Sequence, residues 1–153
     1  MKSVMLSIKP KWCEMIARGQ KTIEVRKSRP KLEAPFKCYI YCTSVKNLNL
    51  QDYVNVHRAT NGAVDDWSGK VIGEFVCDYI LEITPDTYGH HEYFISDDDL
   101  NASCLTTNDL WEHGSGETLY GWHISDLVIY DKPKEISEFA MTRPPQSWCY
   151  VRR

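Results

Sequence analysis

The stretch Gly19-Gln20-Lys21-Thr22-Ile23-Glu24-Val25-Arg26 decides how the chain is interpreted, and it is predicted to be a turn that runs into a strand. Because strand side chains alternate, the polar residues from Thr22 onward fall on one face and the two apolar residues on the other. The apolar pair indicates a side that faces a core. The polar face has two interpretations. It is either a solvated surface with a Glu–Arg pair of little energetic value or the wall of a pocket for a polar ligand.

The composition is that of one globular domain spanning residues 1–153, of which 42% are hydrophobic and 12% aromatic. No apolar run approaches membrane-spanning length, so we expect no membrane partner. The first seven residues turn polar again too soon to form the apolar region of a signal peptide. The expected location is therefore the cytoplasm.

The six cysteines are expected to be free thiols. Four of them lie inside apolar or strand-like segments and no export signal is present, which favours buried thiols in a reducing compartment. Cys38 and Cys42 have no second closely spaced pair, and neither the aspartates at 97–99 nor the histidines match a defined metal site. We predict no metal and no cofactor.

Positive charge is concentrated near the N-terminus. Residues 1–31 hold nine of the 18 Lys and Arg residues but two of the 21 acids, a net of +7 there and −10 elsewhere. The overall charge of −3 argues against a general nucleic-acid binder. The basic segment either forms a local patch that could meet a phosphate backbone or scatters over several faces of the folded protein.

Apolar periodicity and turn signals predict a mixture of strands and short helices. Expected strands cover residues 4–8, 21–27, 36–42, 70–83, 122–124 and 127–130, and residues 146–151 alternate in the same way. Expected helices cover 10–18, 96–105 and 107–114, with a helical turn near 136–139. Residues 45–69 and 84–118 are predicted to be insertions or loops. The fold class is α+β, a small mixed β-barrel with flanking helices.

The long strand at 70–83 carries two unusual residues. Gly73 in its interior predicts a bulge or a close approach of another backbone. Glu74 beside it either lies on the outer face or points into a pocket, where burial would raise its pKa and make it a proton carrier.

The octet Gly19-x-Lys21-x-x-Glu24-x-Arg26 resembles the signature of the ASCH domain family, relatives of the PUA RNA-binding barrel. The resemblance extends to most of the chain except residues 45–68 and 84–118. The further segments that carry it are Leu6-Ser7-Ile8-Lys9-Pro10, Gly69-Lys70-Val71-Ile72-Gly73-Glu74, Tyr120-Gly121-Trp122-His123-Ile124 with Lys132-Pro133, and Pro145-Gln146-Ser147-Trp148-Cys149-Tyr150.

The resemblance implies a five- or six-stranded barrel with a cleft lined by the signature, and RNA or a modified nucleoside as the ligand. One branch of the family hydrolyses the amide of acetylated cytidine with the signature lysine, a threonine and a glutamate. This chain has Glu24 where that branch has the threonine. Another branch has been linked to RNA cleavage, which Lys21, Glu24 and Arg26 could also support.

Two sets of candidate residues follow. For hydrolysis, Lys21 would act as the base, with Glu24 or Glu74 carrying the proton. For binding, cations engage phosphate, hydroxyls or amides reach the ligand, and an aromatic side chain stacks on the base. The binding candidates are Ser7, Lys9, Arg26, Thr43, Trp122, Gln146, Ser147 and Trp148. Tyr150 is a further stacking candidate, and each of these aromatic residues has core packing as the alternative.

The sequence satisfies the binding requirements more completely than the catalytic ones. We therefore predict a domain that binds RNA or a modified nucleoside in a basic cleft around the octet. The alternatives are an amidohydrolase acting on acetylated cytidine-like nucleosides, an RNA-cleaving enzyme, and a protein-interaction module with a vestigial pocket. The oligomeric state is left open.

Overall fold

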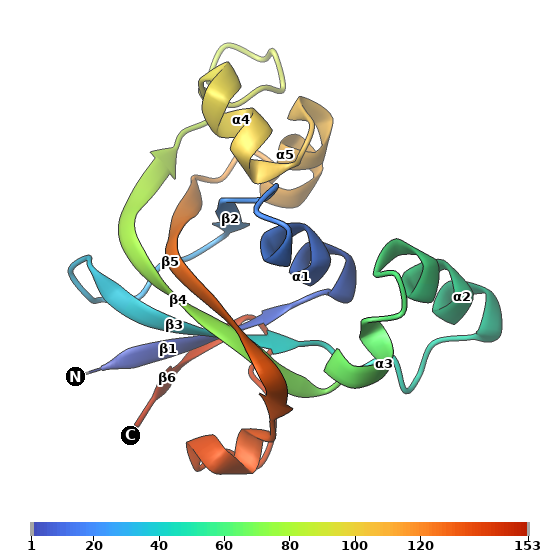
Figure 1. The fold of residues 1–153 in the computed structure, drawn as a ribbon. Helices are drawn as coiled ribbons and strands as arrows, with labels where there is room; N and C mark the ends of the chain where they lie inside the picture. Colours follow the sequence, from blue (N-terminus) through green and yellow to red (C-terminus); the bar gives the residue numbers. More distant parts are fainter. Residues whose placement is uncertain (1, 153) are drawn as a thin grey trace.

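Six strands in one mixed sheet form the centre of the fold (Figure 1), in a computed structural model that describes residues 2–152. The sheet order is β2-β5-β4-β3-β1-β6, with β1 parallel to β3 and the other neighbours antiparallel. The strands are β1 (Ser3–Ile8), β2 (Ile23–Arg26), β3 (Phe36–Cys42), β4 (Lys70–Ile83), β5 (Leu119–Lys134) and β6 (Trp148–Val151). The predicted α+β class with a mixed sheet is confirmed.

The long strands β4 and β5 curve through the whole molecule and carry its irregularities (Figure 1). The strands predicted separately at 122–124 and 127–130 are one strand, β5. Between Glu74 and Val76 the β4–β5 register shifts, and Asp126 has a φ of 48° on the opposite strand. Strand β5 thus accommodates one extra residue as a bulge. In the sequence, the polar pair Ser125-Asp126 at this bulge resembles a loop between two separate strands.

Helices lie at the ends and on one face of the sheet (Figure 1). They are α1 (Pro10–Ala17), α2 (Leu50–Ala59), α3 (Val64–Trp67), α4 (Asp97–Ser103), α5 (Thr107–Gly114) and the 3₁₀ turn η1 (Ile136–Phe139). The side chain of Ser96 caps α4, and Cys104, in the left-handed conformation, follows its last residue, Ser103, so that α4 ends two residues before the predicted end at Leu105. None of the helices in the described part of the chain is long and apolar enough to cross a membrane.

The core is built from the inner faces of the strands and the apolar side of α1. Ile23 and Val25 are buried against β4, β5 and α5, which confirms that the apolar residues of β2 face a core. The four cysteines expected in apolar segments are buried, and all six are free thiols: Cys13, Cys38, Cys42, Cys77, Cys104 and Cys149.

Side chains join the two ends of the sheet. Within residues 2–152, β2 and β6 are the two edge strands of the hydrogen-bonded sheet. The guanidinium of Arg26 on β2 contacts Ser147, directly before β6, and Trp148 Nε1 donates to Ser28 Oγ at 2.9 Å. The Lys31 backbone N–H donates to the Tyr150 hydroxyl at 2.8 Å. These contacts hold the segment after β2 against β6 and so help to define the space between them.

We predict that Gly73→Ala destabilises the fold. A Cβ atom at this position would overlap the Val128 carbonyl oxygen on the neighbouring strand, which is backbone and cannot rotate away. The expected loss of unfolding free energy is about 2–3 kcal/mol, typical of overpacking, measured by urea denaturation.

The matched control is Gly89→Ala, at an exposed position with a φ of +84° and no atom within 4 Å of the added Cβ. Its cost is limited to the backbone conformation, about 1 kcal/mol. Equal losses for the two variants would show that Val128 does not restrict position 73.

Candidate functional site

The octet lies beside a cleft of about 550 Å³ at the meeting point of β1, β2, α1 and the segment before β6. Of the predicted binding residues, six line it: Ser7, Lys9, Arg26, Thr43, Gln146 and Ser147. Glu24, predicted as catalytic, also lines it. Residues from both ends of the sequence meet here because β1 pairs with β6 and Arg26 reaches across from β2.

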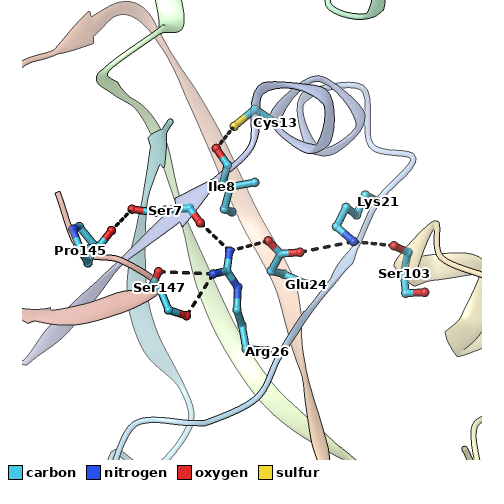
Figure 2. Close-up of polar contacts among 9 residues, drawn as sticks. All are labelled: Ser7, Ile8, Cys13, Lys21, Glu24, Arg26, Ser103, Pro145 and Ser147. Atoms are coloured by element: carbon cyan, nitrogen blue, oxygen red, sulfur yellow. Dashed lines mark hydrogen bonds and ion pairs between the residues drawn. The ribbon is translucent and has the colours of Figure 1, made fainter. Parts of the chain in front are cut away.

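Glu24 is the central charge of the site. Figure 2 shows its carboxylate between two cations, with Oε1 3.4 Å from Lys21 Nζ and Oε2 3.0 Å from Arg26 Nη2. Lys21 is 1% exposed and Glu24 6% exposed. The interpretation of this strand face as a solvated surface is therefore wrong. A buried carboxylate is tolerated because both of its oxygens are paired with cations.

Arg26 extends this network to the other side of the cleft. Its Nη2 donates to the Ser7 carbonyl oxygen at 2.7 Å, and its Nη1 donates to Ser147 Oγ at 3.2 Å (Figure 2). Ser7 Oγ in turn donates to the Pro145 carbonyl oxygen at 2.6 Å. The planar guanidinium offers several donors in fixed directions, so one side chain can hold β1 and the segment before β6 together.

Lys21 extends the network toward the helices. Its Nζ donates to the carbonyl oxygen of Ser103, the last residue of α4, at 2.5 Å, and lies 4.9 Å from the centre of the Trp12 ring. The last carbonyls of a helix lack partners inside the helix and carry a partial negative charge, which a buried ammonium satisfies. Lys21 therefore fixes the end of α4 against β2 and α1.

A second compartment of about 300 Å³ adjoins the cleft on the side of α4 and α5. Trp12, Glu24, Val25 and His113 border both cavities. Leu105, Lys11 and Asp109 belong to the smaller one. The floor of the site is thus the octet strand, and Leu105, Asp109 and His113 form part of its wall.

Positive charge dominates the larger cavity. Lys9, Arg26 and Lys27 line it against the single carboxylate of Glu24. His113 stands at its border. Partial removal of water around the ring, and then the nearby Lys27 and Arg26, lower the pKa of His113 below the ordinary value of 6.5. The imidazole is therefore neutral at pH 7, able to donate or accept a hydrogen bond.

Glu74 lies outside both compartments, and its interpretation as a buried proton carrier is wrong. Its carboxylate pairs with Lys37 Nζ at 2.8 Å and accepts from the Tyr130 hydroxyl at 2.8 Å. The hydrogen bond from Lys37 lowers the pKa of Glu74 below its ordinary value, the opposite of the expected direction. The residue points to the other face of the sheet, as the outer-face alternative required.

The two predicted stacking tryptophans do not line either compartment. Trp122 is completely buried and packs edge-on against Phe36, with 5.8 Å between ring centres. Trp148 lies 5.9 Å from Trp122 and is tied to Ser28. Trp122 is therefore a core residue, which was the alternative to its predicted role in stacking on a base.

Trp12 is the aromatic residue that borders the site, with Lys11 Nζ 4.7 Å and Lys21 Nζ 4.9 Å from its ring centre. Its place on the apolar side of α1 favours core packing, and the half-buried ring does pack against the core while it also borders the site. The available signal was its position directly after Lys9-Pro10-Lys11, at the basic start of the helix.

Sequence reasoning also missed Lys27, Ser28 and His113 as residues of the cleft. Lys27 and Ser28 directly follow the octet, so their position beside it in the sequence was a signal that could have identified them. His113 comes from a segment that had been expected to be an insertion, and no spacing in the sequence linked it to β2. No group of three or more His, Cys, Asp or Glu side chains within residues 2–152 is arranged to hold a metal ion.

Comparison with known families gives one match. Residues 6–76 match the family described as ASCH domain, a range that includes the second half of β1, the octet, β3 and the first half of β4. No curated protein matches the chain significantly.

Comparison with solved structures gives the same fold over nearly the whole chain. An ASCH protein from Zymomonas mobilis is 18% identical with a TM-score of 0.66, over 99% of this chain and 88% of that chain. A tyrosine-to-phenylalanine mutant of the Zymomonas protein has a TM-score of 0.64 and 18% identity, and the match covers 100% of this chain and 92% of that chain. A serine-to-alanine mutant of the same protein has a TM-score of 0.66 and 17% identity, and the match covers 99% of this chain and 89% of that chain. At these identities the likeness establishes the fold.

We predict that Lys21→Met destabilises the protein by about 3 kcal/mol. The variant keeps the length of the side chain but leaves the Ser103 carbonyl without its donor and Glu24 with one cation instead of two, a loss typical of broken buried ion pairs. Urea denaturation measures the effect. Lys11→Met is the control because Lys11 also lies over Trp12 but is exposed. Similar small effects in both variants would contradict the structural role of Lys21.

A second prediction concerns His113. Its pKa, followed by NMR titration of the imidazole protons, is expected below 6.5 and to rise in Lys27→Ala, because one of the cations that disfavour the protonated ring is removed. Lys132→Ala, an exposed lysine outside the cleft, is expected to leave the pKa unchanged. No rise in Lys27→Ala would contradict the basic environment assigned to the histidine.

Proposed function

We propose that the chain, whose residues 6–76 match the ASCH domain family, binds RNA or a modified nucleoside in the cleft beside the octet. The observation that carries the proposal is the excess of cations around this cleft. Lys9, Arg26 and Lys27 line it, while its single carboxylate, Glu24, is already paired with cations. A phosphate group entering the cleft therefore meets positive charge without competition from a free acid.

The cations divide into two groups with different roles. Lys21 and Arg26 are fixed by Glu24 and by the backbone carbonyls of Ser103 and Ser7, so they define the shape of the site. Lys9 and Lys27 are exposed and follow the ends of β1 and β2, where their ammonium groups can turn toward a ligand. A fixed floor with mobile cations around it suits a charged backbone whose position varies.

Neutral groups supply the contacts that a base requires. The half-buried ring of Trp12 offers apolar surface, and its neighbour His113 is neutral at pH 7. Hydroxyl and amide groups of Ser28, Thr43 and Gln146 also line the cleft. Recognition of unpaired bases in RNA commonly combines an aromatic surface with hydrogen bonds to the base edges.

An amidohydrolase is the second candidate, favoured by the buried Lys21–Glu24 pair at one end of a cleft lined with hydroxyl groups. Hydrolysis of an acetylated base needs a group that activates water and a donor for the leaving amine. Lys21 Nζ already donates to Ser103 and pairs with Glu24. The amine would have to leave these partners to act as a base, so binding is the function better supported by the geometry.

The binding proposal predicts separate effects for the exposed cations. Lys9→Ala and Lys27→Ala are each expected to weaken binding of a short single-stranded RNA several-fold and to reduce the slope of log affinity against log salt by about 0.7. Fluorescence anisotropy at several salt concentrations measures both quantities. Lys132→Ala, which removes an equal charge elsewhere on the surface, is expected to bind like wild type. Equal losses in all three variants would mean that the cleft is not the binding site.

The two functions are separated by incubation with N4-acetylcytidine. Binding alone gives a saturable titration with no cytidine released at high protein concentration. Release of cytidine that is lost in Glu24→Gln, with the cleft still able to bind, would establish hydrolysis instead.

A further inference from the structure

The smaller compartment beside the cleft is not required for binding a single nucleoside. Its volume of about 300 Å³ comes in addition to the 550 Å³ of the larger cavity. This volume corresponds to roughly ten water molecules of the liquid, which is large enough to admit one heteroaromatic base. Trp12 and His113 stand at the border of both compartments. The rings of Trp12 and His113 can therefore contact ligand groups in either compartment.

The two compartments differ in charge. Three cations line the larger one against a single carboxylate, whereas the smaller one has Leu105 as an additional apolar wall. Its remaining charges are balanced, because Lys11 is matched by Asp109 and Lys21 by Glu24. An anionic group is therefore favoured in the larger compartment and an uncharged planar group in the smaller one.

We propose that the site binds a dinucleotide unit of single-stranded RNA. One nucleotide and the linking phosphate occupy the larger compartment, and the neighbouring base enters the smaller one, past Trp12 and His113. This inference rests on the proposed function and adds to it the number of bases that the site holds. A succession of base-sized spaces beside a basic groove is how single strands are bound when stacking contributes to affinity.

Charge allows the inference to be tested against simple electrostatic attraction. Cytidine 3′-monophosphate carries a charge of about −2 at pH 7.5, because its second pKa is near 6, while the dinucleoside monophosphate CpC carries one negative charge. A site that only attracts phosphate binds the mononucleotide more tightly. A site with a place for the second base prefers CpC despite its lower charge.

The experiment measures both dissociation constants by isothermal titration calorimetry. We expect wild-type protein to bind CpC at least about fivefold more tightly than cytidine 3′-monophosphate, the lower end of the contribution of one stacked base. The same comparison is made between ApA and adenosine 3′-monophosphate. Tighter binding of the dinucleotide than of the mononucleotide, in either the cytidine or the adenosine pair, supports the inference.

A filling variant locates the second base. Leu105→Trp places a large side chain in the smaller compartment and is expected to bring CpC affinity down to that of the mononucleotide, with mononucleotide affinity within about twofold of wild type. Asn108→Trp, which adds the same group to the exposed surface of α5, is expected to preserve the preference. Circular dichroism verifies that both variants fold, and the wild-type comparison stands without them.

The outcomes separate this inference from the function on which it rests. Binding of the mononucleotide with no preference for either dinucleotide overturns the two-base site and leaves the proposed function intact. Equal weakening of both ligands by Leu105→Trp also overturns it, because the compartments would then not be separate. Failure of wild-type protein to bind any of the four ligands or a short RNA overturns the proposed function itself.

Discussion

The carboxylate of Glu24, held between Lys21 and Arg26, is the interaction on which the rest of the site depends. Each of the two cations also has a second partner in another part of the molecule. Lys21 reaches the end of α4 through Ser103, and Arg26 reaches β1 and the segment before β6. One buried acid thus fixes the relative positions of the helices and the sheet edges. Because removing three charges from water is costly, this network is better understood as a device that fixes geometry than as a source of stability.

The arrangement separates the charges that fix the shape of the cleft from those that remain exposed around it. The innermost charges are occupied by one another and by backbone carbonyls, so they cannot turn freely toward a ligand. The outer lysines, Lys9 and Lys27, are exposed and lie at the ends of strands that the network holds in place. Pre-organisation of this kind lowers the entropic cost of binding, because the shape of the site exists before the ligand arrives. The polar strand face, for which a solvated surface was one of two interpretations, is therefore the structural basis of the cleft.

What could be predicted from the sequence depended on how local each signal was. The alternation in β2 and the helices predicted over 10–18 and 96–105 depend on signals within a few residues, and the structure confirms these elements. The octet and its flanking segments also indicated the fold. The positions of Trp12, Glu74 and His113 depend instead on which elements pack together in space. Glu74 shows this most clearly, since its neighbours Lys37 and Tyr130 come from other strands and reverse the expected direction of its pKa.

The cleft draws its walls from opposite ends of the sequence, with Ser7 and Lys9 near the start and Gln146 and Ser147 near the end. Bringing together residues so far apart carries a large loop-closure cost, which packing around the contact must offset. The hydrogen bond between Arg26 and Ser147 closes such a loop across the cleft, because the two residues are 121 positions apart. A chain interrupted before residue 146 would retain the octet and most of its basic residues but lack the wall that confines a ligand. The cleft is thus a long-range feature of the fold, built jointly by segments that no short stretch of the chain contains.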